Sequence, residues 1–272
     1  MKKRKIENSS VFIGLFMRWI RLIVRFFGFL IGSTVYGIIL VIGRRFSTNP
    51  IQWRNRIARS WGHVMVRLCG GRVTIFGTLP KPPFVFVCNH IGYVDVPVLL
   101  SVLDGVFIAK SEVRSWPLLG LLAIAGQTIF VDRSRRADVV RVNQAIAEQL
   151  SDQQGLILFP EGTSTDGTHV LPFKPSLLAY PASRNLPVYY ASLTYQTPPG
   201  EMPAHRVIGW GNDDDVFLKH VMRFFQIPSF SAVLTFGDAP VIASDRKVLA
   251  KILQDRVLVQ FVPLGDHAVS QT

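Results

Sequence analysis

A histidine and an aspartate stand five residues apart in the segment 89–95 (NHIGYVD), directly after the apolar run 84–88. On one continuous helix, His90 and Asp95 would point about 140° apart and could not touch. A turn at Gly92, followed by a helix that begins near Asp95, would let them converge. The aspartate would then fix the imidazole tautomer and leave the other ring nitrogen as a general base. Taken alone, the spacing is more typical of a helix-capping aspartate beside an incidental histidine.

Two further segments end in polar residues that directly follow an apolar run. Residues 126–133 (GQTIFVDR) end in Arg133, and an arginine at the carboxyl end of a strand is well placed to bind a phosphate through two parallel hydrogen bonds. A surface arginine paired with a neighbouring acid is the alternative. Residues 159–164 (FPEGTS) place Glu161 in a turn. The loop that follows lacks the lysine of a nucleotide-binding P-loop, so a P-loop enzyme is excluded. The chain also has no G-x-S-x-G motif, which argues against a serine hydrolase.

The elements expected around these segments alternate between short apolar runs and helical stretches from about residue 72 onward. The strand candidates are 72–76, 84–88, 106–109, 128–131, 156–159, 187–193, 206–210 and 232–236. The helix candidates are 53–68, 96–103, 136–150, 174–184, 214–226 and 245–260. This alternation predicts an α/β fold with a mixed, mainly parallel sheet flanked by helices. In such sheets, functional sites gather at the carboxyl ends of the strands.

Positive charge is concentrated in the first quarter of the chain. Residues 1–72 hold 14 Lys and Arg and one acidic residue, whereas residues 73–272 hold 16 basic and 17 acidic residues. The basic part is also the most apolar, which is typical of a segment on an anionic membrane surface. A net charge of +12 also suits a nucleic-acid binder, but the chain has no zinc-finger spacing and no RNA-binding aromatic motif. We therefore predict membrane lipids as partners, and no nucleic acid.

Residues 1–45 are predicted to form a basic, amphipathic and hydrophobic membrane anchor, followed by a catalytic domain over 46–272. The uncharged run 26–43 would span about 27 Å as a helix, close to the thickness of the bilayer's hydrocarbon core. Upstream, Arg18, Arg21 and Arg25 share one helical face, which predicts a helix lying in the membrane interface. These arginines also argue against a signal peptide, as does the lack of a small-x-small cleavage pattern.

The orientation of this segment stays open, because basic residues flank the apolar run on both sides. A spanning helix, a shallow two-helix hairpin with both ends in the cytoplasm, and a buried soluble helix are the alternatives. The two cysteines, Cys69 and Cys88, fit no metal spacing, and we interpret them as buried thiols in a reducing compartment, with a disulfide between them as the alternative. The sequence thus predicts no metal and a catalytic domain facing the cytoplasm at the inner membrane.

The order of these motifs resembles the glycerolipid acyltransferase superfamily, in particular the bacterial 1-acylglycerol-3-phosphate acyltransferases. The shared pattern is N-H-x-x-x-x-D, then G-x-x-x-F-V-x-R, then F-P-E-G-T, then the LPV of 186–188, across roughly residues 60–240. The segments 110–113 (KSEV), 116–120 (WPLLG) and 172–174 (PFK) also match that family. Two positions depart from it: Ser164 stands where many members carry Arg, and Ser176 where many carry Gly.

The resemblance implies an O-acyltransferase. His90 would be the general base and Asp95 its orienting partner, which suits a lysolipid hydroxyl, because removing its proton in the transition state contributes about 10²–10⁴-fold. Arg133, with Lys110 as a helper, would hold the phosphate of the acceptor. The acyl donor would be acyl-CoA or acyl carrier protein, which is a co-substrate, and no cofactor is implied.

The acceptor pocket would be shaped by Glu161, Gly162 and Thr163. By the resemblance, the acceptor would be 1-acylglycerol-3-phosphate and the product phosphatidate, in phospholipid biosynthesis. Because Ser164 removes a cation beside that pocket, the zwitterionic lyso-ornithine lipid is an alternative acceptor. A catalytically inactive, membrane-bound lipid-binding protein on the same scaffold is a further alternative, and the intact motif residues argue against it.

Overall fold

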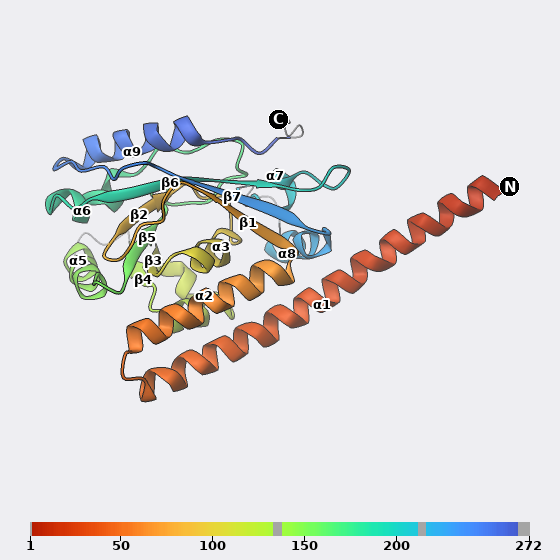
Figure 1. Ribbon diagram of the computed structural model, residues 1–272, viewed down its shortest axis with the longest axis horizontal. Helices are drawn as coiled ribbons and strands as arrows, with labels where there is room; N and C mark the ends of the chain where they lie inside the picture. Colours follow the sequence, from red (N-terminus) through yellow and green to blue (C-terminus); the bar gives the residue numbers. More distant parts are fainter. Residues whose placement is uncertain (1, 133–137, 212–215, 266–272) are drawn as a thin grey trace.

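The structure is a computed structural model that describes residues 2–132, 138–211 and 216–265. Within these residues, seven strands form a sheet in the order β1-β7-β6-β2-β5-β3-β4 (Figure 1). The strands are β1 (Gly71–Phe76), β2 (Val85–Cys88), β3 (Gly105–Lys110), β4 (Ile129–Val131), β5 (Gly155–Leu158), β6 (Val188–Gln196) and β7 (Phe230–Phe236). Each neighbouring pair is parallel except β6 and β7. The predicted α/β fold with a mixed, mainly parallel sheet is confirmed.

Helices cover both faces of this sheet (Figure 1). The α-helices are α1 (Lys2–Phe46), α2 (Pro50–Leu68), α3 (Asp95–Val102), α4 (Leu119–Ala125), α5 (Asp138–Gln149), α6 (Ala179–Ser183), α7 (Ala204–Val207), α8 (Phe217–Gln226) and α9 (Arg246–Gln260), with 3-10 turns η1 (Ser111–Ser115) and η2 (Pro175–Leu178). Alternate residues of β2 enter two apolar clusters: Phe86 lies with α2, α3 and α8, and Val87 lies with α5 and α9. The strand that leads to His90 is therefore buried on both faces, as expected for the centre of a parallel sheet.

Segment 206–210 is not the strand that the sequence predicts. The helix α7 ends at Val207, and the amides of Ile208 and Gly209 both donate to the Ala204 carbonyl. Val207 and Ile208 are fully buried, so this apolar run is a turn in the core. Periodicity over five residues cannot separate such a turn from a buried strand. The expected helix 174–184 is likewise split, into η2 and α6, and α4 was not predicted.

The N-terminal part is one continuous helix, where an interfacial helix and a separate apolar helix were expected. It turns back through residues 47–49, and α2 packs along it (Figure 1). The Asn49 side chain begins α2 by accepting the Gln52 amide. At Gly32 the side chain of Met65 packs directly on the backbone of α1, since a Cβ there would lie 2.7 Å from Met65 Cε. Small residues of this kind permit tight helix packing in lipid.

One arginine of α1 lies inside the protein. Arg25 is 5% exposed, and its guanidinium donates to four backbone carbonyls: those of Leu68 (3.0 Å), Phe225 (3.1 Å), Ile227 (2.5 Å) and Pro228 (2.9 Å). These carbonyls lie at or just beyond the ends of α2 and α8, where helices carry partial negative charge. The prediction that Arg18, Arg21 and Arg25 together face a membrane surface is therefore wrong for Arg25. Arg18 pairs with Glu201 at 3.3 Å.

The opposite side of α1 is apolar and exposed. The large side chains exposed there include Phe16, Trp19, Ile23, Phe27, Ile31, Ile38 and Val41. Within the stretch Ile13–Phe46, an 18-residue window has a mean hydropathy of 2.1, and the helix is long and apolar enough to cross a bilayer. Because soluble proteins rarely expose a continuous apolar surface of this extent, the helix indicates membrane association.

Candidate active site

The predicted site residues gather at one edge of the sheet. The strands β2, β5, β3 and β4 are neighbours and parallel, so their carboxyl ends lie at the same edge. His90 follows β2, Glu161 follows β5, and Lys110 ends β3 opposite Val131 of β4. The predicted Arg133 lies outside the residues that the structure describes.

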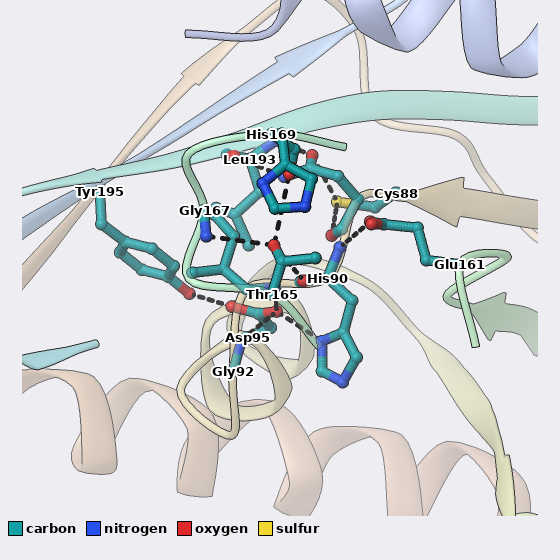
Figure 2. Close-up of polar contacts among 12 residues, drawn as sticks. Cys88, His90, Gly92, Asp95, Glu161, Thr165, Gly167, His169, Leu193 and Tyr195 are labelled. Carbon is teal, nitrogen blue, oxygen red and sulfur yellow. Dashed lines mark hydrogen bonds and ion pairs between the residues drawn. The ribbon is translucent and has the colours of Figure 1, made fainter. Parts of the chain in front are cut away.

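The turn between β2 and α3 brings His90 and Asp95 together (Figure 2). His90 Nδ1 lies 2.7 Å from Asp95 Oδ2, and the same oxygen accepts the amides of Ile91 (2.7 Å) and Gly92 (3.0 Å). The chain reverses at Gly92, whose carbonyl accepts the Asp95 amide, and α3 begins at Asp95. A Cβ on Gly92 would lie 2.6 Å from the Ile208 carbonyl oxygen, so this position requires glycine. The predicted turn and the predicted contact are confirmed.

Asp95 is fully buried, and its second oxygen also has a donor. Tyr195 Oη, on β6, donates to Asp95 Oδ1 at 2.8 Å. Because amides and a hydroxyl donate to the carboxylate, it serves as an acceptor, and His90 Nδ1 carries the proton between them. His90 Nε2 is then the ring nitrogen able to accept a proton. The His90 side chain is 21% exposed, so the ring lies at the open side of this buried pair.

The imidazole is also held on one face. The rings of His90 and Phe159 stack with centroids 4.0 Å apart and an angle of 9° between their planes. Phe159 in turn stacks on Phe107 of β3. The ring of His90 is thus fixed by Asp95 at one nitrogen and by Phe159 across one face, which keeps Nε2 in one direction.

Glu161 ties the backbone of the turn to a distant loop. Its Oε1 accepts the His90 amide and its Oε2 accepts the Leu171 amide, both at 2.7 Å. The side chain is buried, and burial raises the pKa of Glu161 to about 7, because the two amide bonds offset only part of the loss of water. Through these two bonds the carboxyl group helps to position the backbone of His90. Its role in shaping the acceptor pocket stays a prediction.

Further bonds hold the remaining peptides of the turn. The buried Asn89 side chain donates to the Leu193 carbonyl (2.9 Å) and accepts the Leu193 amide (2.7 Å), which joins the turn to β6. The His90 carbonyl accepts the Thr165 amide (2.9 Å), and the Ile91 carbonyl accepts the Trp210 amide (2.8 Å). The backbone of the turn is therefore bonded to β6 and to the segments around Thr165 and Trp210.

The other predicted pocket residues lie on the same edge of the sheet. Gly162 is buried with a φ of 72°, a conformation that favours glycine, and its amide donates to the Phe159 carbonyl. Thr163 is exposed, and Ser164 and Lys110 are half-buried. Their contacts with an acceptor stay predictions.

No group of three or more His, Cys, Asp or Glu in the described ranges could hold a metal ion. Cys69 and Cys88 are buried and unpaired, as the sequence predicts. Burial raises the pKa of both thiols, that of Cys69 to about 12, so neither is a ready nucleophile.

Comparison with known proteins identifies the family. The family model described as Acyltransferase matches residues 72–191. The lyso-ornithine lipid O-acyltransferase of Brucella abortus (strain 2308) is 32% identical over 228 residues, which are 78% of this chain and 85% of that protein. This chain belongs to the glycerolipid acyltransferase superfamily. The resemblance inferred from the motifs is confirmed.

Two further proteins resemble this acyltransferase. The 1-acyl-sn-glycerol-3-phosphate acyltransferase of Neisseria meningitidis serogroup B is 33% identical over 153 residues, 56% of this chain and 60% of that protein. The crystal structure of the 1-acyl-sn-glycerophosphate (LPA) acyltransferase of Thermotoga maritima has a TM-score of 0.67 at 18% identity, and the match covers 93% of this chain and 100% of that one. At this identity, the structural likeness shows the fold alone.

The residues that hold the His90–Asp95 pair in place were not predicted from the sequence. Tyr195 lies 100 residues from Asp95 in the chain, and no local spacing marks it. Only the strand order, which sets β6 beside β2, brings it near. Asn89 and Phe159 lie within the recognised motifs, and a buried asparagine directly after a buried strand is a signal for side-chain bonding to the backbone.

Proposed function

We propose that this acyltransferase moves a fatty acyl group from a thioester carrier to the free hydroxyl of a lysolipid, with His90 as the general base. The observation that carries the proposal is the 2.7 Å contact between His90 Nδ1 and the buried Asp95. It supports a fixed tautomer in which Nε2 accepts the hydroxyl proton.

In the proposed reaction, the acceptor hydroxyl gives its proton to His90 Nε2 while its oxygen attacks the carbonyl carbon of the thioester. A carbon–oxygen bond forms, and the carbonyl electron pair moves onto the carbonyl oxygen. When this tetrahedral intermediate collapses, the carbon–sulfur bond breaks and the thiolate takes the proton back from His90. Asp95 stabilises the imidazolium between the two proton transfers. The products are the acylated lipid and the free thiol of the carrier, which is CoA or acyl carrier protein.

For the acceptor, we propose lyso-ornithine lipid ahead of lysophosphatidate, which the motifs alone favoured. The match to the Brucella lyso-ornithine lipid enzyme covers 85% of that protein, whereas the match to the Neisseria 1-acylglycerol-3-phosphate enzyme covers 60%. In addition, Ser164 supplies a neutral hydroxyl at the position where many members of the family carry an arginine. A zwitterionic head group needs that cation less than a phosphate does.

Lysophosphatidate is the second candidate, and two basic residues favour it. Lys110 ends β3 at the catalytic edge, and Arg133 follows β4 in the sequence. If they bind a phosphate, Arg133→Lys should raise the KM of lysophosphatidate much more than that of the donor, because lysine cannot reproduce a two-bond contact. In that case, the product is phosphatidate and the protein serves phospholipid biosynthesis.

We also propose that residues 1–45 hold the domain 46–272 at the cytoplasmic face of the inner membrane. The exposed apolar side of α1 supports this placement, since a lysolipid acceptor is itself dissolved in the bilayer. A membrane-held enzyme meets that acceptor without extracting it into water.

The proposed function is tested by offering labelled acyl-CoA and acyl-acyl carrier protein with lyso-ornithine lipid, lysophosphatidate and glycerol 3-phosphate in parallel. We expect a kcat/KM for lyso-ornithine lipid at least about tenfold above that for lysophosphatidate, which corresponds to one ion-pair-sized interaction. Ser164→Arg should narrow this ratio. Thr74→Arg, an exposed position on the edge strand β1 at the other end of the sheet, is the control and should leave the ratio unchanged. A preference for lysophosphatidate would overturn the acceptor assignment, and transfer to none of the three would overturn the enzyme assignment.

A further inference from the structure

We propose that Tyr195 is a positioning residue of the dyad, which holds the second oxygen of Asp95 and thereby makes His90 release its proton more readily. The proposal rests on the proposed role of His90 as the base. It starts from one contact: Tyr195 Oη donates to Asp95 Oδ1 at 2.8 Å, on the oxygen that His90 does not use (Figure 2).

The phenol of Tyr195 has a fixed place. Tyr195 is 2% exposed, it pairs with Ala232 of β7 in the sheet, and its ring packs edge-on against Phe230. Burial, together with the neighbouring Asp95, raises the pKa of Tyr195 well above its usual value. The hydroxyl therefore keeps its proton throughout the working range of an enzyme, and towards Asp95 it acts only as a donor.

Hydrogen bonds to a carboxylate withdraw negative charge from it. Three donors reach Asp95 Oδ2, namely His90 and the amides of Ile91 and Gly92, and these belong to the same turn. Tyr195 donates from a different element, β6, and it reaches the other oxygen. Without it, more negative charge faces the imidazole and the protonated ring is favoured. A base that already holds a proton cannot accept one from the acceptor hydroxyl.

Other titratable groups surround the turn and must be separated from this effect. Burial and, to a smaller extent, the negative charge of Asp95 raise the pKa of Glu161, which follows β5, to about 7. Cys88, at the end of β2, has a pKa raised well above its usual value by burial. From α8, His220 bonds to the hydroxyl of Tyr93 in the turn, and burial lowers the His220 pKa. A substitution at Tyr195 leaves all of these groups in place, so they cancel when two variants are compared.

The test compares Tyr195→Phe with Tyr190→Phe in the full chain, held in lipid nanodiscs. Tyr190 is a matched control, because it lies on the same strand but belongs to the apolar cluster on the opposite face of the sheet. For Tyr195→Phe, we expect the acid limb of the kcat/KM profile to move up by about half to one pH unit, the size of one lost hydrogen bond. The midpoint of the His90 ring signal in a histidine-labelled NMR titration should move by the same amount. Tyr190→Phe should move neither.

A merely structural role predicts something else. It would lower the rate at every pH and leave the midpoints of the kcat/KM acid limb and of the His90 ring signal unchanged. That result would overturn the proposal. Asp95→Asn combined with Tyr195→Phe should be no worse than Asp95→Asn alone, because Tyr195 acts through Asp95. An additive loss would also count against it.

A measurement on the wild-type chain replaces the variant if Tyr195→Phe does not fold, and the NMR midpoints do not depend on the acceptor. Should Tyr195→Phe not fold, the wild-type chain labelled at tyrosine Cζ supplies the measurement. The chemical shift of Tyr195 Cζ should change with pH at the same midpoint as the His90 ring signal. A different midpoint would overturn the proposal. The NMR midpoints need no turnover. An error in the acceptor or in the reaction would thus appear in the assay alone and leave the link between Tyr195 and His90 intact.

Discussion

Two regions of this protein bury a charged side chain for different reasons. At the turn after β2, His90 and Asp95 form a hydrogen-bonded pair at the end of a strand that is apolar on both faces. In α1, Arg25 lies inside the protein, while large apolar side chains cover the exposed side of the same helix. Apolar surface left in water costs about 25 cal/mol per Å², so the arrangement in α1 suits lipid rather than water. In the first region the buried charge belongs to the pair that we propose as catalytic. In the second region it marks the side of α1 that faces its own domain.

The largest effect is expected from Asp95→Asn, which tests the first region. The asparagine has the same shape, but its amide nitrogen would face one of the groups that donate to Asp95. The side chain would then no longer fix the tautomer of His90. We expect acyl transfer to fall by about 10³–10⁴-fold, measured as thiol release from acyl-CoA in the presence of the acceptor. Asp104→Asn, a half-exposed carboxylate just beyond α3, is the control and should leave turnover within about twofold. A loss of less than tenfold for Asp95→Asn would show that the pair is not the reacting centre.

Arg25→Met tests the second region. The substitution keeps the length of the side chain but leaves the carbonyls at the ends of α2 and α8 without a donor, at a cost of about 3 kcal/mol. The thermal midpoint in detergent, followed by tryptophan fluorescence, should fall by roughly 6–10 °C. Arg18→Met removes a partly exposed ion pair from the same helix and should cost less than about 1 kcal/mol. Equal, small effects of both changes would mean that the inward side of α1 does not hold the domain.

Glu161 gives a smaller effect that depends on pH. Because its pKa rises from the usual 4.5 to about 7 on folding, the folded protein binds this proton more tightly than the unfolded chain does. The contribution of Glu161 to stability is therefore complete below about pH 4.5 and is lost as the pH rises through about 7. Between about pH 5 and pH 8, wild type should lose about 2 kcal/mol relative to Glu161→Gln, which does not titrate. The thermal midpoints of the two proteins measure this, and a constant difference would contradict the raised pKa.

The part of the site that lies within one turn could be predicted from the sequence. His90, Gly92 and Asp95 are neighbours along the chain, so their spacing and the need for a reversal define their geometry. The partners from other elements could not be predicted in this way. Tyr195 reaches Asp95 only because β6 pairs with β2, and strand order is a property of the whole sheet.

The fold shows the same division between local and global information. Alternating apolar runs and helical stretches were enough for the α/β class and for most of the strands, but not for segment 206–210, where an apolar run forms a turn. In α1, the spacing of Arg18 and Arg25 shows correctly that they share a side of the helix. It cannot show whether that side meets lipid or protein, because the carbonyls that receive Arg25 lie up to about 200 residues away.

The central claim is that His90 takes the proton of the acceptor hydroxyl. The most direct measurement is single-turnover transfer of a labelled acyl group to lyso-ornithine lipid by wild type, His90→Ala and the control His63→Ala, which removes an exposed histidine of α2. We predict that His63→Ala transfers at the wild-type rate and that His90→Ala, folded to the same thermal midpoint, transfers at less than about one hundredth of it. A folded His90→Ala protein that exceeds one hundredth of the wild-type rate would contradict the account.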